Sequence, residues 1–314
     1  MAYLSVLAAR MTRVAAIDCG TNALRLLIAD VDATGKLTDL VRLMRTVRLG
    51  EGVDRTGEFS AAALERTFAA CDEYASIISG HEVERARFVA TSASRDVANR
   101  DEFFAGVSTR LGFSPEVIAG TEEAGLSYEG ATRSLHDVVG PALVVDIGGG
   151  STEFVLGEQS VSVNIGCVRM TERHLHSDPP TSAEIEHVRK DLAEAMRQAG
   201  ESVDLRAAGT LVGVAGTVTT VAARALGLDS YDPEVLHGAV IEREPLERAI
   251  AELVAMSRAE RAALPYMHPG RVDVIGGGAL VLGAVVDAVA VPRITVSECD
   301  ILDGIAYRLA AVTT

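Results

Sequence analysis

The sequence predicts an α/β protein of two domains that face each other across a cleft, and three observations carry this prediction. The chain has 314 residues, which exceeds one average domain and fits two of moderate size. Hydrophobic residues make up 48% and aromatic residues only 4%, with 29 glycines, a composition that suits helices packed closely on buried strands. A strand, Asp, turn, strand pattern occurs twice, starting at Asp18 and at Asp146. In a duplicated α/β fold, two such turns lie face to face across a cleft.

The first half of the chain is predicted to form a hairpin, a helix, a strand and a second helix. Residues 13–32 give two apolar strands around the tight polar turn Asp18-Cys19-Gly20-Thr21-Asn22. Residues 60–79 begin at an N-cap serine and place apolar side chains at helical spacing. A short strand at 87–91 and a helix at 99–111 complete a unit of the βαβ type.

The second half repeats the opening pattern and then adds helices. The expected elements are a strand at 142–146, a glycine-rich turn, a strand at 153–157, a charged helix at 182–199, and a strand that runs into Gly213–Thr217 before a helix ending near Ala225. The segment Gly276-Gly277-Gly278 is expected to be a turn before a helix and a strand, and a C-terminal helix follows Ser297.

Charge and apolar content exclude several classes of function. The net charge of −15 opposes binding to nucleic acid, so a polyanionic substrate requires a local basic strip and a divalent cation. The most apolar stretch, 272–291, carries two aspartates and a glycine triplet and predicts no membrane-spanning helix. The N-terminal MAYLSVLAARMTR lacks the basic start of a signal peptide, which predicts a cytoplasmic protein whose native start is either Met1 or Met11. Reduced structural thiols are predicted for Cys19, Cys71, Cys167 and Cys299, which show no CxxC pair.

The two Asp turns carry the residue types that bind phosphate. Glycine has no Cβ and lets backbone N–H groups converge on phosphate oxygens, hydroxyls add donors, and an aspartate at a strand end can hold hydrated Mg²⁺. Either turn alone could be a simple hairpin connection, but the matched pair favours a phosphate site. The expected phosphate-binding residues are Asp18, Gly20, Thr21 and Asn22 in the first turn and Gly148, Gly149, Gly150, Ser151 and Thr152 in the second, with Asp146 as the metal ligand.

Four further segments, taken with these turns, resemble the Ppx/GppA family of exopolyphosphatases and guanosine pentaphosphate phosphohydrolases. They cover residues 90–99, 117–124, 145–153 and 165–169, and their order and spacing match over nearly the whole chain. The turns, with Gly216-Thr217 and the glycine triplet, also look like the phosphate and adenosine loops of the actin, sugar kinase and chaperone ATPase superfamily. The resemblance implies two actin-like (ribonuclease H-like) domains in the short form of the family. The expected boundaries are 11–131 together with the C-terminal helix 298–314 for the first domain, and 132–297 for the second.

The resemblance also implies which carboxylates are catalytic. Glu123, the one before Ala124, is the candidate base for the attacking water, although an acid at a helix N-terminus is also favoured by the macrodipole. Neighbouring side chains on a helix point in different directions, so Glu122 is expected to face away from the cleft. Glu153 is either a second catalytic carboxylate beside Asp146 or a surface acid at a strand end.

Arginines are expected to hold the phosphates of the substrate and to offset the negative charge of the chain. Arg95 follows a short strand in a run of small residues, where a guanidinium can bind phosphate bidentately. A salt bridge with Asp96 or Asp101 is the alternative for this side chain. Arg25 and Arg169 are weaker candidates for the same role.

The implied reaction is Mg²⁺-dependent attack of water on a terminal phosphoanhydride, releasing phosphate from inorganic polyphosphate. A guanosine pentaphosphate 5′-phosphohydrolase and a non-catalytic regulator that binds polyphosphate or an alarmone are the alternatives, and an ATP-dependent small-molecule kinase would share the two turns. The Glu-Glu-Ala segment argues for a hydrolase, and the four acids Asp18, Glu123, Asp146 and Glu153 together argue against lost activity. No nucleic acid or membrane partner is expected. The oligomeric state is open, with a homodimer as one alternative.

Overall fold

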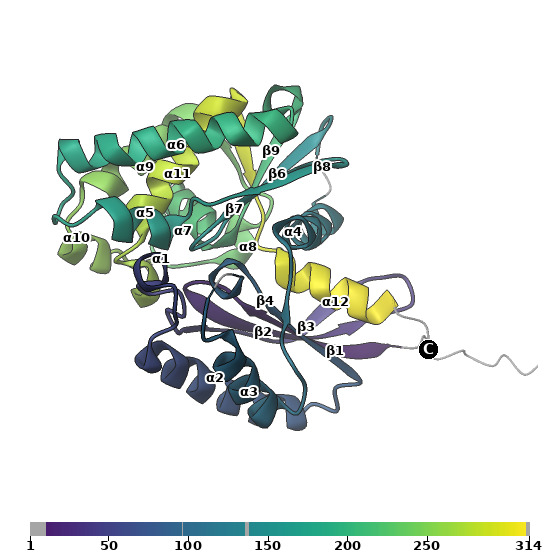
Figure 1. The fold of residues 1–314 in the computed structure, drawn as a ribbon. Coiled ribbons are helices and arrows are strands. Elements are labelled where there is room, and N and C mark those ends of the chain that lie inside the picture. Colours follow the sequence, from purple (N-terminus) through teal and green to yellow (C-terminus); the bar gives the residue numbers. More distant parts are fainter. Residues whose placement is uncertain (1–10, 96, 136–137, 312–314) are drawn as a thin grey trace, which may run out of the picture.

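The computed structural model describes residues 11–95, 97–135 and 138–311, and it contains two β-sheets with helices packed against them (Figure 1). We call the part built on the first sheet, with strands β1 to β5, the first lobe, and the part built on the second sheet the second lobe. The N-terminal segment up to residue 10, with the choice between Met1 and Met11, lies outside the described residues.

The first sheet has the strand order β3-β2-β1-β4-β5. Its strands are β1 (Thr12–Cys19), β2 (Ala23–Val31), β3 (Leu37–Thr46), β4 (Arg85–Ala90) and β5 (Glu116–Val117). Strands β1 and β2 form the antiparallel hairpin that the apolar runs around the polar turn predicted, and its register places Asp18 opposite Arg25. Strand β4 runs parallel to β1, so the turns after both strands lie at the same edge of the sheet.

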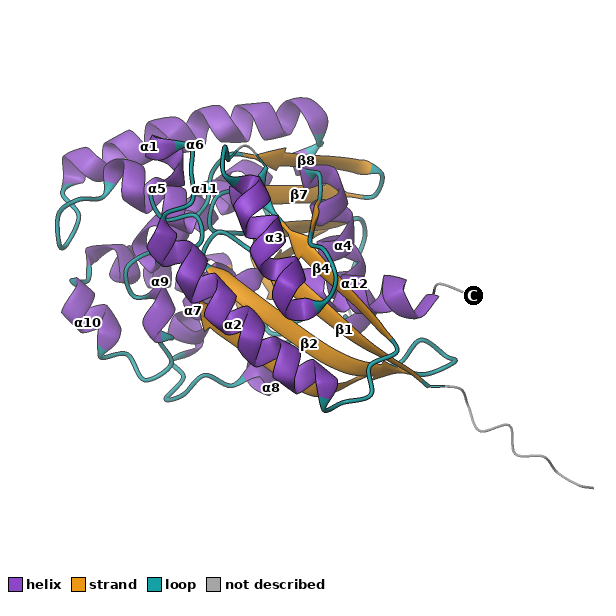
Figure 2. Cartoon of the chain, turned by 60° about the horizontal axis from the view of Figure 1, so that its bottom comes forward, coloured by secondary structure: helices purple, strands orange, loops and turns teal. Residues whose placement is uncertain are grey.

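Helices cover both faces of this sheet. Helices α2 (Ala61–Ser79) and α3 (Arg100–Leu111) lie on one face (Figure 2), and α12 (Ile301–Ala311) lies on the other. Because side chains alternate along a strand, Ile17 and Ile28 pack toward α2 and α3, whereas Ala16 and Leu27 pack toward α12. Helix α2 begins at the predicted cap, where Ser60 Oγ accepts a hydrogen bond of 3.2 Å from the backbone N–H of Ala63.

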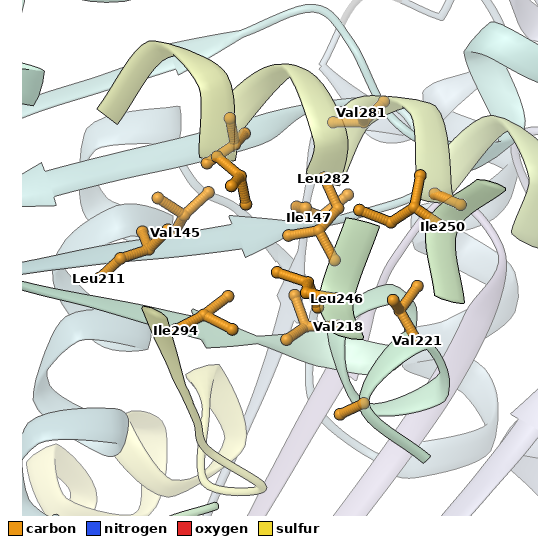
Figure 3. Packing of buried hydrophobic residues seen from close by; sticks show 14 of the residues in the cluster. Val145, Ile147, Leu211, Val218, Val221, Leu246, Ile250, Val281, Leu282 and Ile294 are labelled. Atoms are coloured by element: carbon orange, nitrogen blue, oxygen red, sulfur yellow. The ribbon is translucent and has the colours of Figure 1, made fainter. Parts of the chain in front are cut away.

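The second sheet has the strand order β10-β11-β9-β6-β7-β8. Its strands are β6 (Ala142–Ile147), β7 (Thr152–Leu156), β8 (Gln159–Val163), β9 (Thr210–Val214), β10 (Val240–Glu242) and β11 (Arg293–Val296). The helices packed on one face include α5 (Cys167–His174), α6 (Ser182–Ser202), α7 (Ala215–Leu226), α9 (Arg243–Ala255) and α11 (Ile275–Val289). Figure 3 shows Val145, Leu211 and Ile294 of the strands facing Val218 and Leu282 of these helices.

Short helical segments connect the larger elements: α1 (Val53–Thr56), η1 (Ser92–Ser94), η2 (Leu205–Ala207), α8 (Pro233–Leu236), α10 (Arg258–Ala262) and η3 (Pro269–Arg271). The expected turn at Gly276–Gly278 is wrong, because these three glycines form the first turn of α11. A Cβ on Gly277 would lie 2.8 Å from the carbonyl oxygen of Cys167, so the triplet is needed where α11 crosses α5.

Helix α4 (Gly120–Ser134) joins the two lobes. It packs against β6, β7 and β8 of the second sheet and against α12, which covers the first sheet. The two helices cross closely at glycines, since a Cβ on Gly130 would lie 1.9 Å from the carbonyl oxygen of Asp300, and one on Gly304 would lie 2.1 Å from that of Leu126. The boundary expected between residues 131 and 132 therefore falls inside a continuous helix.

Two further features concern the chain as a whole. The cysteines Cys19, Cys71, Cys167 and Cys299 are all free thiols, as predicted. Within the parts of the chain that the structure describes, no helix is both long and apolar enough to cross a membrane.

Candidate active site

Both Asp turns open onto one cleft between the lobes, with a cavity volume of about 120 Å³. Ten of the predicted site residues line it: Asp18, Gly20, Thr21, Asn22, Arg25, Glu123, Asp146, Gly148, Gly149 and Ser151. The turns approach each other directly, since a Cβ on Gly149 would lie 2.8 Å from Thr21 Cβ. Arg95 and Gly150 line an adjoining cavity instead. Thr152 and Glu153 lie just behind the second turn and are fully buried.

The first turn is closed by its own backbone and neutralised by an arginine. The N–H of Gly20 donates to the carbonyl oxygen of Ala23 at 3.0 Å. Arg25 donates from Nε (2.9 Å) and Nη2 (2.6 Å) to Oδ2 of Asp18, and its Nη1 pairs with Asp300 at the start of α12. Burial raises the pKa of Asp18 although the charge of Arg25 opposes this shift. Oδ1 of Asp18 is buried and has no hydrogen-bond partner among the described residues.

The second turn has the same backbone closure but a different partner for its aspartate. The N–H of Gly148 donates to the carbonyl oxygen of Ser151 at 3.0 Å. Oδ2 of Asp146 accepts a hydrogen bond of 2.6 Å from Ser127 on α4. Burial, followed by the charge of Asp300, raises the pKa of Asp146 to about 6. Asp146 therefore binds a proton more readily than a solvent-exposed aspartate does.

In each turn, the N–H group of the first glycine donates the hydrogen bond that closes the turn, and the N–H groups of the next two residues remain free to bind a ligand. Over the described residues, the N–H groups of Thr21, Asn22, Gly149 and Gly150 have no hydrogen-bond acceptor, unlike those of Gly20 and Gly148. Free N–H groups that converge from two turns form a site for an anion. The middle residues of both turns therefore have N–H groups that remain free to donate to a ligand.

Glu153 is the cross-strand neighbour of Asp146 and is only 1% exposed. The alternative of a surface acid at a strand end is therefore wrong. Its Oε1 accepts hydrogen bonds from Ser151 Oγ (2.7 Å) and Ser162 Oγ (2.6 Å), whereas its buried Oε2 has no partner within the described chain. Burial and the charge of Asp146 raise the pKa of Glu153 to about 7.

The neighbours Glu122 and Glu123 have opposite environments. Glu123 is buried at the cleft, where it pairs with Arg95, and Glu122 is more exposed and accepts from Arg87 at 2.8 Å. Burial, and then the charge of Glu153, raise the pKa of Glu123 despite Arg95. The alternative of an ion pair between Arg95 and Asp101 is not found in the described part of the structure, because the guanidinium turns toward Ile118 O and Glu123. Asp96 lies outside the described residues.

Three site residues were not identified from the sequence. Ser127 lies four residues after Glu123 on the same face of α4, so helical spacing was an available signal. Arg271 lines the cleft, donates to Thr220 Oγ1 at 3.0 Å and lies 5.7 Å from the ring centre of Tyr231. Asp300 holds Arg25 from the segment that returns to the first lobe. No local sequence signal marks Arg271 or Asp300, since only tertiary packing brings them here.

Comparison with known proteins identifies the family of the chain. Residues 27–312 match the sequence model of the Ppx/GppA phosphatase family. The chain belongs to this family. This Ppx/GppA phosphatase is 50% identical to a relative named Exopolyphosphatase 2, from Mycobacterium tuberculosis. The match covers 96% of the present chain and 99% of the relative. The guanosine-5′-triphosphate,3′-diphosphate pyrophosphatase of Aeromonas hydrophila is 28% identical over 94% of the chain, which spans 59% of that relative.

A solved structure confirms the predicted α/β fold of this Ppx/GppA phosphatase. The Aquifex aeolicus member of the family superposes with a TM-score of 0.80 at 30% identity, covering 95% of this chain and 97% of the other. Because the match covers 95% of the chain, the predicted actin-like fold holds for nearly the whole chain.

The carboxylates of this Ppx/GppA phosphatase suit a cation that also binds phosphate. Among the residues described, no three His, Cys, Asp or Glu side chains form a ligand cluster of their own. Mg²⁺ in phosphate sites uses one or two carboxylates and completes its shell with water and phosphate oxygens, so it does not require such a cluster. Such a cation takes carboxylate oxygens as ligands. The cleft is lined by Asp146, and two buried carboxylate oxygens nearby, Asp18 Oδ1 and Glu153 Oε2, have no hydrogen-bond partner within the described chain.

Proposed function

We propose that this Ppx/GppA phosphatase is an exopolyphosphatase that releases terminal phosphate from inorganic polyphosphate with Mg²⁺. The observation that carries the proposal is that both Asp turns, which have free N–H groups, and the buried carboxylate of Glu123 line the same cleft. The high identity to a relative named Exopolyphosphatase 2 supports this substrate class.

The two turns bind and orient the terminal phosphoryl group. The N–H groups of Thr21 and Asn22 donate from one side, and those of Gly149 and Gly150 from the other, while the hydroxyls of the turns add further donors. Phosphoryl transfer requires little covalent chemistry from protein, so this positioning and the neutralisation of charge dominate the rate.

Glu123 orients the attacking water and accepts its proton. The water oxygen forms a bond to the terminal phosphorus, and the bond from that phosphorus to the bridging oxygen breaks, so the shortened chain leaves with the bridging oxygen. A base works best when its pKa lies near the working pH, and burial raises the pKa of Glu123 in that direction. Arg95, paired with Glu123, keeps the carboxylate oriented and lies ready to contact phosphate.

Asp146 is the residue that would hold Mg²⁺, together with the free carboxylate oxygen of Glu153. A divalent cation held by these carboxylates would supply positive charge against the negative phosphoryl oxygens. The hydrogen bond from Ser127 fixes the orientation of the Asp146 carboxylate, and Ser151 and Ser162 do the same for Glu153. Charged carboxylates in this buried place require a cation, because burial alone disfavours their ionised form.

Phosphate release tests the proposal directly. Polyphosphates of several lengths, guanosine pentaphosphate and ATP are incubated in parallel with the protein and Mg²⁺, and kcat/KM is compared. We expect the highest value for polyphosphate. A higher value for guanosine pentaphosphate would favour a guanosine pentaphosphate 5′-phosphohydrolase instead. Tight binding of polyphosphate or of an alarmone without any phosphate release would favour a regulator.

A further inference from the structure

A second cavity adjoins the cleft and shares two lining residues with it. Thr21 and Ser92 line both spaces, and their hydroxyl oxygens are 3.0 Å apart. A Cβ on Gly150 would lie 2.8 Å from Ser92 Oγ and 2.9 Å from Thr21 Oγ1. The boundary between the two spaces therefore consists of two hydroxyls and a glycine, which are groups that hydrogen-bond to phosphate and leave room for it.

Two arginines reach this second cavity. Arg95 spans both spaces, because it lines the second cavity while its guanidinium pairs with Glu123 in the cleft. Arg169 donates from Nε to the carbonyl oxygen of Gly150 at 2.7 Å, which fixes its guanidinium beside the second turn. Both side chains are about one-fifth exposed, so a ligand can reach them while bulk water screens them only in part.

A carboxylate of the first lobe forms ion pairs with two arginines of the second lobe. Asp54 of α1 pairs with Arg169 Nη1 and, at 2.8 Å, with Arg173 Nη2, both on α5. Glu172 also lines the cavity and accepts a hydrogen bond of 3.1 Å from the backbone N–H of Gly52. Glu172 is thus tied to the first lobe by a backbone group, whereas Asp54 takes guanidinium donors that a phosphate oxygen would otherwise use.

From these contacts we propose that the second cavity binds the phosphoryl groups that follow the terminal one in a linear polyphosphate, and that Asp54 competes with them for Arg169. This inference rests on the proposed function and adds a place for the rest of the substrate. Apart from Val53 and Val168, the residues that line the cavity are glycine, alanine, polar or charged, and none is aromatic. A nucleobase would find no ring to stack on here, which favours a linear phosphate chain over a nucleotide in this space.

Two substitutions distinguish this proposal from a purely structural contact between the lobes, because the proposal predicts that they change KM for long-chain polyphosphate in opposite directions. Arg169→Gln removes a phosphate donor, so we expect KM for long-chain polyphosphate to rise roughly three- to tenfold, and to rise less for tripolyphosphate. Asp54→Asn removes the competing charge, so KM for the long chain should fall by about two- to fivefold. Arg248→Gln, which removes an equal charge from an exposed ion pair on α9, is the matched control and should change neither value.

The same variants are also titrated with long-chain polyphosphate in excess chelator, which measures binding without turnover. The subsite is supported if Arg169→Gln weakens polyphosphate binding and Asp54→Asn strengthens it, and if binding to Arg169→Gln depends less on salt than binding to the wild-type protein. If both variants change the affinity in the same direction, Asp54 and Arg169 only hold the lobes together. If neither variant changes it, the polyphosphate chain binds elsewhere. Either result overturns the proposal. If the wild-type protein releases no phosphate from any polyphosphate, the proposed function fails, and the titrations still decide the subsite.

Discussion

The two Asp turns share one sequence pattern, yet they differ in how their charge is balanced. Asp18 is held by a fixed cation, since Arg25 donates two hydrogen bonds to one of its oxygens. Asp146 is held by a neutral donor, the hydroxyl of Ser127, and lies beside the buried Glu153. The first turn therefore carries its own counter-charge, whereas the second depends on protons or on a bound cation.

This difference assigns distinct tasks to the two lobes. The first lobe presents a neutralised turn with free N–H groups, which suits an anion. The second lobe presents carboxylates whose pKa values are raised to about 6 and about 7, which suits a cation that arrives with the substrate. The predictions that follow test this division, beginning with the residue between the lobes.

Glu123→Gln is expected to have the largest effect. Glutamine keeps the size and most of the hydrogen bonding of the side chain but accepts no proton from water, so kcat should fall roughly 10²–10⁴-fold with little change in substrate affinity. Steady-state phosphate release from polyphosphate measures both quantities. The same change at the more exposed Glu122 is the matched control and should leave turnover near normal.

Other outcomes for this pair would be equally informative. If Glu122→Gln abolished turnover and Glu123→Gln did not, the role of base would belong to the neighbouring residue. If both variants kept normal turnover, the hydrolase mechanism would be wrong, and a regulator that binds polyphosphate would explain the site better. A helix-terminal charge without a catalytic role predicts only a stability loss below about 1 kcal/mol.

The second lobe should lose stability as the pH rises. The folded-state pKa values of Asp146 and Glu153 lie above their ordinary values, so both acids bind protons more tightly in the folded state. Their contribution is present below about pH 4 and is lost as the pH rises through about 6 to 7. Thermal unfolding in chelator should show a lower Tm at pH 8 than at pH 5.

Glu153→Gln provides the control for this pH dependence, because it removes one of the two titrations and should flatten the fall in Tm. Mg²⁺ should raise Tm more at pH 8 than at pH 5, since it binds the ionised carboxylates. An identical pH profile in the variant and the wild-type protein would show that these carboxylates do not carry the effect.

The smallest predicted effect concerns the helix crossing that joins the lobes. Gly130→Ala would place a Cβ 1.9 Å from the carbonyl oxygen of Asp300 and should lower the free energy of unfolding by about 1 to 3 kcal/mol. Gly125→Ala lies on the same helix, where a Cβ meets only the flexible end of Arg308 at 3.4 Å. It should raise stability by up to about 1 kcal/mol. Denaturant unfolding of both variants measures the difference, and equal effects would argue against a tight crossing.

Local patterns in the sequence were sufficient to predict the two Asp hairpins and several helices, but not β3, β8, β10 or α9. The apolar runs around Asp18 and Asp146 predicted two hairpins, and Ser60 marked the start of α2, because these signals depend on neighbouring residues only. The glycine triplet was wrongly predicted to be a turn, since its small size serves a crossing between α11 and α5 that is invisible in one segment. The partners Asp300 and Arg271 were missed for the same reason.

The site was predicted in its residues but not in their electrostatics. The sequence placed Glu123, Asp146 and Arg95 in one site through a family resemblance. It did not predict that Arg95 pairs with Glu123, because burial at the interface of α4 and the first lobe decides that contact. It also left Glu153 undecided between the surface and the site, a choice that only the pairing of β7 with β6 and β8 resolves.

The Mg²⁺ requirement of phosphate release tests the division between the two turns most directly. Phosphate release from polyphosphate is followed during Mg²⁺ titration, starting from excess chelator, for the wild-type protein, Asp146→Asn and Asp18→Asn. We predict no release in chelator, a rise of about tenfold or more in the half-saturating Mg²⁺ concentration for Asp146→Asn, and an unchanged requirement for Asp18→Asn even where its turnover falls. Full activity in excess chelator, or an equal shift in both variants, would contradict this account.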